Sequence, residues 1–284
     1  MNDTHQRTLL PPLRRGRSFL LAFPGLAALG FFFLLPLGVV VAEAFEGDAL
    51  VRFFRAEFVD ALLRSLALGL GAGAVSLALG IPVALHLARL PPARRALLQV
   101  AIALPLTFSG LIVAYGFILV LGRAGFVTLL LAEFGADPAA VARFLYSAPG
   151  LVLAYTYYLV PRVVLMLLPV FVNFDERQLE AAESMGASRA QALLHVLAPQ
   201  VAPTALAAFC LVAAVAIGAY GTALALVGTQ VNLLPLRLYS LVADAGADFP
   251  LAAALSLVLL AVCSLIMAAA EVAAARAEPR HAHA

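Results

Sequence analysis

The chain has 284 residues, of which 64% are hydrophobic and 12% charged, with a mean hydropathy of +1.01. Soluble globular domains are about 45–50% apolar and about 25% charged, so this composition excludes that class and indicates an integral membrane protein. All 18 basic residues are Arg, and a Walker A motif needs a Lys to hold nucleotide phosphates. We therefore expect no cofactor on this chain, and its net charge of +2 gives no reason to expect a nucleic-acid partner.

Six apolar segments are long enough for membrane helices, each of which needs about 20 residues. They lie at 19–43, 65–88, 97–121, 148–172, 205–228 and 250–272. We predict an all-α polytopic membrane protein with one six-span domain over 19–272. Residues 1–18 and 273–284 are predicted to form short tails.

The first span follows a cluster of Arg residues, as the apolar part of a signal peptide also does. Its apolar run exceeds the roughly 7–15 residues of a signal peptide and lacks a convincing cleavage site, so we predict a retained span. In the second span, Gly69 and Gly73 stand four residues apart, a spacing that predicts close approach of another helix.

The connection 122–147 is the longest on its side of the membrane. Its apolar piece, 126–134, is too short to span and is expected to lie along the interface or to form a re-entrant segment. Asp137 and Pro138 then predict the start of a short helix, with Asp as N-cap and Pro at the first position.

A polar stretch, residues 173–203, interrupts the apolar second half of the chain, and we call it the elbow. Its first short helix is predicted to start at Asn173 or Asp175, because Asp175 and Gln178 have the spacing of a capping box. Gly186 is expected to end that helix in the left-handed conformation.

A second short helix is predicted after the bend. Ser188 and Gln191 have the spacing of another capping box, and Pro199 stands where this helix is expected to stop or kink.

The elbow resembles the EAA loop of permease subunits of binding-protein-dependent ABC importers. Ala198 and Leu193 depart from the family pattern, which has Leu and often Phe there. The positions that match are Glu180, Ala181, Ala182, Gly186, Ala187, Val196 and Pro199.

The resemblance implies a type I ABC importer permease fold and a coupling helix that docks on a separate ATPase dimer, which binds the ATP. Glu180 and Glu183 stand three apart on one helical face and could meet basic groups of that ATPase. The expected coupling residues are Glu180, Ala181, Ala182, Glu183, Gly186, Ala187 and Ser188.

Residues 219–256 extend the resemblance, with an aromatic-Gly pair, Leu-Pro-Leu, a Tyr and Asp-Phe-Pro before an Ala-rich last span. The pattern is similar to importers of spermidine/putrescine, thiamine, iron and phosphonate, and is most like the spermidine/putrescine type. It implies three kinds of partner: the ATPase dimer, a second permease, homologous rather than identical, and an extracytoplasmic solute-binding protein.

Charge distribution predicts the orientation. The side that holds both termini, the 89–95 connection and the elbow carries eleven Arg, and the other side carries six. By the positive-inside rule, both termini and the elbow are expected to be cytoplasmic, in a multi-pass protein of the bacterial inner membrane.

Arg162 lies near the middle of the fourth span, where a charge costs about 2.5–3.5 kcal/mol. We predict either that it lines the translocation path or that it is a structural Arg bonded to helix carbonyls. Tyr157, Tyr158 and Tyr220 are the other candidate path residues. The spans lack a mid-membrane carboxylate to pair with Arg162, which favours anionic or zwitterionic cargo over cations.

No metal site is expected, because His86 and His195 lack partners at ligand spacing. Cys210 and Cys263 lie in apolar runs, so no disulfide framework is expected. An enzyme would need clustered catalytic groups, which are not evident. The alternative function is a secondary transporter or channel driven by an ion gradient, but it predicts intramembrane carboxylates or inverted repeats, which are not evident either.

Overall fold

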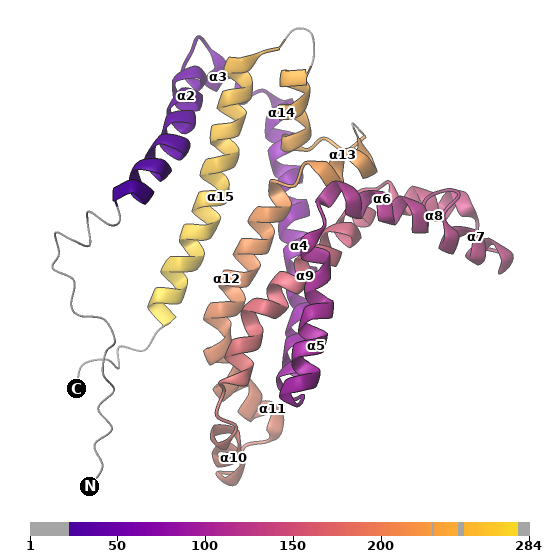
Figure 1. Ribbon diagram of the computed structural model, residues 1–284, viewed down its shortest axis with the longest axis vertical. Coiled ribbons are helices and arrows are strands. Elements are labelled where there is room, and N and C mark those ends of the chain that lie inside the picture. Colours follow the sequence, from indigo (N-terminus) through magenta and orange to yellow (C-terminus); the bar gives the residue numbers. More distant parts are fainter. Residues whose placement is uncertain (1–22, 229, 244–246, 278–284) are drawn as a thin grey trace.

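A computed structural model describes residues 23–228, 230–243 and 247–277, and the regular elements in these ranges are all helical (Figure 1). The predicted all-α class is confirmed. The predicted N-terminal tail at 1–18 and residues 278–284 of the C-terminal tail lie outside the described residues.

The helices follow one another along the chain with short connections. They are α2 Leu35–Ala44, α3 Ala49–Phe53, α4 Ala56–Ala88, α5 Pro92–Ala103, α6 Gly110–Leu121, α7 Phe126–Glu133, α8 Pro138–Leu145, α9 Ala148–Val172, α10 Arg177–Ser184, α11 Arg189–Ala192, α12 Ala198–Ile217, α13 Gly221–Val227, α14 Leu234–Ala243 and α15 Phe249–Ala277.

Six helical segments of the described ranges are long and apolar enough to cross a membrane, which confirms the predicted number of spans. The first, second, fourth and sixth include the predicted ranges or nearly so, whereas the third and fifth are displaced along the chain. The segments are Phe23–Ala44, Ala56–Ala88, Gly110–Glu133, Ala148–Val172, Arg189–Ile217 and Phe249–Ala273.

The third predicted span, 97–121, is wrong as a continuous helix. The chain leaves α5 through a 3-10 turn at Leu104–Thr107, where Pro105 has no N–H to donate and Thr107 Oγ1 donates to Leu104 O at 2.7 Å. Phe108 and Ser109 are extended, and α6 starts anew with Ser109 as N-cap, its Oγ accepting from Ile112 N at 3.4 Å. The chain therefore changes direction where uniform hydrophobicity predicted a straight helix.

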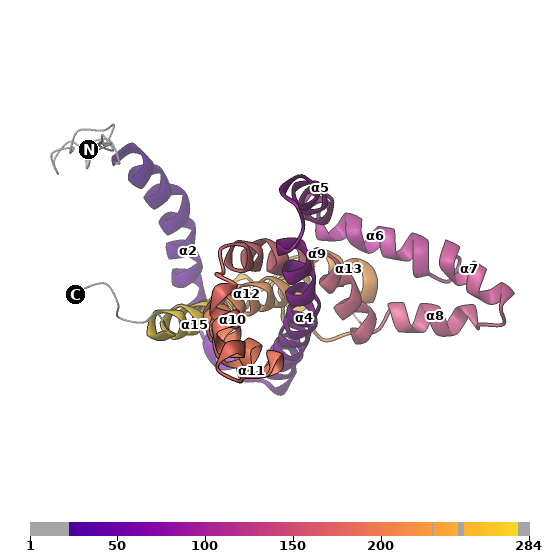
Figure 2. The ribbon, with the colours of Figure 1, turned by 90° about the horizontal axis from the view of Figure 1, so that it is seen from below.

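Beyond this break, α6, α7 and α8 run sideways from the bundle as a lateral arm, visible in both views (Figures 1 and 2). The predicted helix start at Asp137 is confirmed, because Asp137 Oδ1 accepts from Ala139 N at 2.9 Å and Pro138 is the first helical residue. The apolar piece expected at 126–134 forms α7, Phe126–Glu133.

The core of the bundle is formed by α4, α9 and α12, which pack against one another (Figure 2). Of the six candidate spans, α9 is the most buried, and its Leu159, Val163 and Leu167 are fully enclosed. Tyr155 of α9 is also fully buried and donates through its hydroxyl to Ala219 O at 2.9 Å. Because lipid is as apolar as these side chains, close van der Waals contact rather than exclusion of water holds the three helices together.

Glycines on α4 permit the closest contacts in this core. A Cβ added at Gly69 would lie 2.3 Å from Ile217 Cγ1 of α12, and one at Gly73 would lie 3.3 Å from Ala213 Cβ. The close approach predicted from this glycine pair is confirmed. Gly80 makes the equivalent contact with α9, since a Cβ there would lie 2.5 Å from Val163 Cγ1 and 2.8 Å from Val163 Cβ.

We expect Gly80→Ala to destabilise the folded protein by about 1–3 kcal/mol, because the rigid Val163 must move to admit the methyl group. Gly71→Ala is the matched control on the same helix, because a Cβ there meets nothing within 4 Å. It is expected to be neutral or slightly stabilising, since Ala favours helix over Gly. Thermal unfolding of the two purified variants measures the difference, and equal midpoints contradict the packing argument.

Candidate functional site

The elbow lies at one end of the bundle, between the end of α9 and the start of α12 (Figure 1). Seen from that end, α10 and α11 lie on the side of the core helices that faces the viewer (Figure 2). The turn that joins α4 to α5 is close to it, because Arg89 shares a pocket with residues of α10 and α11. The elbow thus contacts the ends of the helices that form the core.

Gly186 ends α10 as the sequence predicted, with φ of +93°. Its N–H donates to Glu183 O at 2.9 Å, and the next N–H, that of Ala187, donates to Ala182 O at 3.1 Å. These two bonds form a Schellman motif, which satisfies carbonyls at the helix end and requires a positive φ at the Gly186 position. A Cβ at Gly186 would meet nothing within 4 Å, so the backbone conformation and not crowding demands glycine here.

The second predicted capping box is confirmed. Ser188 Oγ accepts from Gln191 N at 3.3 Å, and Gln191 Oε1 accepts from Ser188 N at 2.9 Å. Each side chain therefore satisfies a backbone donor of the other, which fixes the start of α11 directly after the Gly186 turn.

The first predicted capping box is wrong. Asp175 Oδ1 accepts from Arg177 N at 3.1 Å, but the N-cap position of α10 belongs to Glu176. Gln178 Oε1 instead accepts from Gln200 Nε2 at 2.7 Å. This bond joins α10 to the first turn of α12, a tertiary contact that local spacing could not reveal.

Pro199 does not stop the second helix. The chain runs without a break from Arg189 to Ile217 and passes through a π-helical turn at Leu193–Leu197 just before the proline. A proline ring clashes with the carbonyl four residues earlier, here that of His195, and the wider π turn relieves this clash. The elbow therefore continues directly into the fifth span, which is why that span starts earlier than predicted. The span also ends earlier, at Ile217, where Gly218 is the C-cap of α12.

Most of the predicted coupling residues are exposed on the elbow. Glu180, Ala181 and Glu183 are exposed, whereas Ala182 is only 7% exposed and packs inward. Ala182 stays a predicted coupling residue, although its side chain is buried rather than exposed. Gly186 and Ser188 are exposed, and Ala187 is half-buried.

Sequence reasoning missed Met185, which is 83% exposed at the turn between α10 and α11. A large apolar side chain beside a glycine turn, within a polar stretch, was the signal that could have identified it. The elbow also holds a polar pocket of about 520 Å³ between α10, α11 and the end of α4. Its lining residues are Arg89, Glu176, Leu179, Glu180, Glu183, Arg189 and Leu193.

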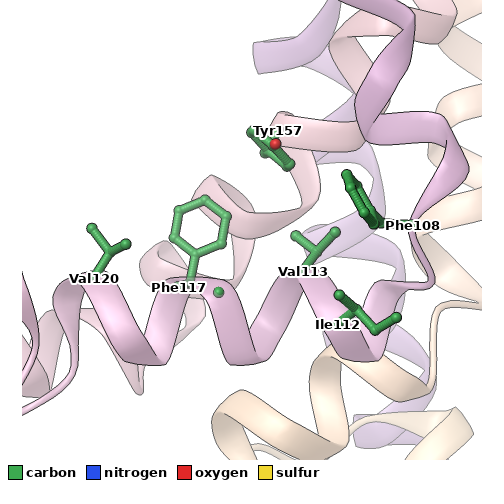
Figure 3. A pocket seen from close by; sticks show the side chains of 7 residues that line it. Phe108, Ile112, Val113, Phe117, Val120 and Tyr157 are labelled. Carbon is green, nitrogen blue, oxygen red and sulfur yellow. The ribbon is translucent and has the colours of Figure 1, made fainter.

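The four candidate path residues do not gather in one place. Tyr157 lies in an apolar pocket of about 340 Å³, against Phe117 of α6 with ring centroids 5.8 Å apart (Figure 3). Tyr220 packs against Tyr239, with centroids 4.9 Å apart. Arg162 and Tyr158 share a pocket.

That shared pocket, of about 370 Å³, lies between α9, the start of α6 and the start of α13. Arg162 Nη1 donates to Tyr158 O at 3.3 Å, and its guanidinium carbon lies 5.8 Å from the centre of the Tyr158 ring. The bond to the Tyr158 carbonyl agrees with the structural alternative, and the open pocket agrees with the path alternative. Ser109 and Thr222, which sequence reasoning did not select as site residues, complete its polar lining.

Comparison with known proteins places the chain in a family. Residues 76–282 match the family described as Binding-protein-dependent transport system inner membrane component. The chain is 29% identical over 227 residues to the Spermidine/putrescine transport system permease protein PotB of Escherichia coli (strain K12), which covers 80% of this chain and 82% of that protein. It is 31% identical over 227 residues to the Putative 2-aminoethylphosphonate transport system permease protein PhnU of Salmonella typhi, covering 76% and 77%.

The fold is similar to that of a bacterial ABC transporter involved in the import of the acidic polysaccharide alginate. The TM-score is 0.70 at 19% identity, over 93% of this chain and 98% of the other. A second alginate transporter structure, in complex with an alginate pentasaccharide-bound periplasmic protein, gives a TM-score of 0.67 at 20% identity, over 90% and 93%. The resemblance stated from the elbow is thereby confirmed: the chain belongs to the family of binding-protein-dependent transport system inner membrane components and is the permease subunit of an ABC importer.

Proposed function

We propose that the elbow is the surface on which a separate ATPase dimer docks, and that this chain forms half of a translocation path with a second, homologous permease. ATP binds and is hydrolysed on the ATPase, and an extracytoplasmic solute-binding protein delivers the cargo. The elbow faces the cytoplasm, as the excess of Arg on its side of the membrane favours. The ion-gradient alternative is set aside because the chain belongs to an importer family that depends on binding proteins.

The observation that carries this proposal is the way the elbow is held. The Gly186 turn and the Ser188–Gln191 capping box fix both sides of the bend, and the Gln178–Gln200 bond ties α10 to α12. A segment that transmits a displacement must keep its shape, and these hydrogen bonds hold the shape of the elbow. The exposed Glu180, Glu183 and Met185 then offer two charges and one apolar contact to the ATPase.

The route from the elbow into the membrane is continuous. Because α11 passes through the π turn into α12, a displacement of the elbow shifts the fifth span as one piece. That span packs on α4 and α9. ATP-driven closure of the ATPase dimer therefore shifts the equilibrium between two arrangements of the core helices. The cargo is a small organic solute, as are the spermidine/putrescine and 2-aminoethylphosphonate in the names of the relatives PotB and PhnU.

We expect Gly186→Val to uncouple ATP hydrolysis from transport while the spans remain folded. Val strongly disfavours the positive φ of +93°, so the turn must rearrange and tilt α10. Gly135→Val is the matched control, because Gly135 in the lateral arm also has a positive φ, of +89°, and open space around it. Uptake per ATP hydrolysed, measured in proteoliposomes of the whole transporter, is expected to fall only for Gly186→Val, and normal coupling in that variant contradicts the role of the turn.

We also expect the double variant Glu180→Arg and Glu183→Arg to lose most of its ATPase on copurification. Charge-assisted contacts contribute about 1.5–3 kcal/mol each, so reversal weakens docking by at least tenfold. Glu133→Arg on α7 is the control, since Glu133 is equally exposed but lies outside the elbow. If the elbow variant retains the ATPase at low ionic strength as fully as the control, the docking surface is elsewhere.

A further inference from the structure

The pocket around Arg162 brings together three groups that all favour negative charge. Arg162 comes from α9, the first residues of α6 form one wall, and Thr222 comes from α13. These elements are far apart in the sequence, so the tertiary fold alone assembles the pocket.

Arg162 has no counter-ion among the residues that the structure describes, because none of their carboxylates forms an ion pair with it. A guanidinium carries five N–H donors, and Arg162 places one of them on the Tyr158 carbonyl. A cation within the membrane that is neither neutralised nor fully bonded is costly, so the remaining donors favour an anionic acceptor.

The start of α6 adds to the positive electrostatic potential that Arg162 creates in the pocket. The helix has 12 residues, and the first N–H groups of a helix lack intrahelical acceptors. Ser109 Oγ accepts from Ile112 N, while Gly110 and Leu111 line the pocket. The positive end of the helix dipole therefore faces the same space as the guanidinium.

Thr222 adds a hydroxyl to the pocket wall. It is 1% exposed, and its Oγ1 lies close to the Tyr158 side chain without meeting strict hydrogen-bond geometry there. The hydroxyl is directed at the start of α6, because a Cβ added at Gly110 would lie 2.4 Å from Thr222 Oγ1. A hydroxyl held this loosely can turn from Tyr158 toward a bound group, so Thr222 is a candidate donor to a ligand in the pocket.

We propose that this pocket binds an oxyanion group of the cargo, a phosphonate, phosphate or carboxylate, as the cargo crosses the membrane. The inference rests on the proposed function, in which this chain forms half of the path. Arg162 neutralises the anion, the start of α6 donates backbone N–H groups, and Thr222 donates its hydroxyl. The transported solute is then anionic or zwitterionic, such as the 2-aminoethylphosphonate in the name of the relative PhnU, rather than a polyamine, which Arg162 repels.

The test is ligand-dependent stabilisation of the whole transporter, with its ATPase and second permease, in nanodiscs. The probes are 2-aminoethylphosphonate and methylphosphonate, with ethylamine and spermidine as amines that lack the anion. We expect only the two phosphonates to raise the thermal midpoint. Arg162→Gln is expected to weaken their apparent affinity by about 10- to 100-fold, and Thr222→Val by about 2- to 10-fold, while Arg162→Lys weakens it less than Arg162→Gln.

Arg143→Gln on α8 is the control, because this exposed Arg lies outside the pocket and is expected to leave the phosphonate response unchanged. A phosphonate response that survives in Arg162→Gln, or stabilisation by spermidine alone, overturns the inference. Loss of the second permease from the Arg162→Gln complex also overturns it, since Arg162 then serves the interface between subunits. Copurification of the ATPase is scored separately, so failure of the proposed function is distinguished from failure of the anion pocket.

Discussion

Close packing of α4, α9 and α12 holds the bundle together and positions both candidate sites. In a bilayer the helices gain little from burying apolar surface, so association requires short contacts between backbones. The contacts of Gly69 with Ile217 and of Gly80 with Val163 provide them. Both candidate sites are built on this core, because the elbow connects α9 to α12 and Arg162 projects from α9.

The elbow and the Arg162 pocket are linked through the same two helices. A displacement of the elbow reaches α12 through the π turn, and α12 leads directly to Ala219, Gly221 and Thr222 at the pocket wall. Tyr155 of α9 holds this wall through the Ala219 carbonyl. The proposed docking surface and the proposed anion pocket therefore lie on one connected set of backbone segments, so that ATPase closure can change the shape of the pocket.

Local patterns predicted those features that depend on neighbouring residues. The positive φ at Gly186, the Ser188–Gln191 capping box and the helix start at Asp137 all follow from side chains within three residues of one another. The Asp175–Gln178 capping box was wrong because a distant residue, Gln200, competes for the Gln178 side chain. Ala182 is a predicted coupling residue whose side chain is buried, and spacing alone cannot assign a helical face to a partner or to the chain itself.

The all-helical class, the six spans and the ABC-permease type of the elbow could be predicted from the sequence, because hydrophobic length, capping and glycine turns are local properties. Contacts between distant segments place Arg162, Thr222 and the start of α6 around one pocket and leave Tyr157 and Tyr220 outside its lining. The break of the third predicted span at Pro105 is likewise visible only in the folded chain. A membrane helix is apolar on every face, so hydropathy does not distinguish the face that contacts lipid from the face that contacts another helix. Which face meets which neighbour is therefore determined by the shapes of side chains brought together from distant parts of the chain.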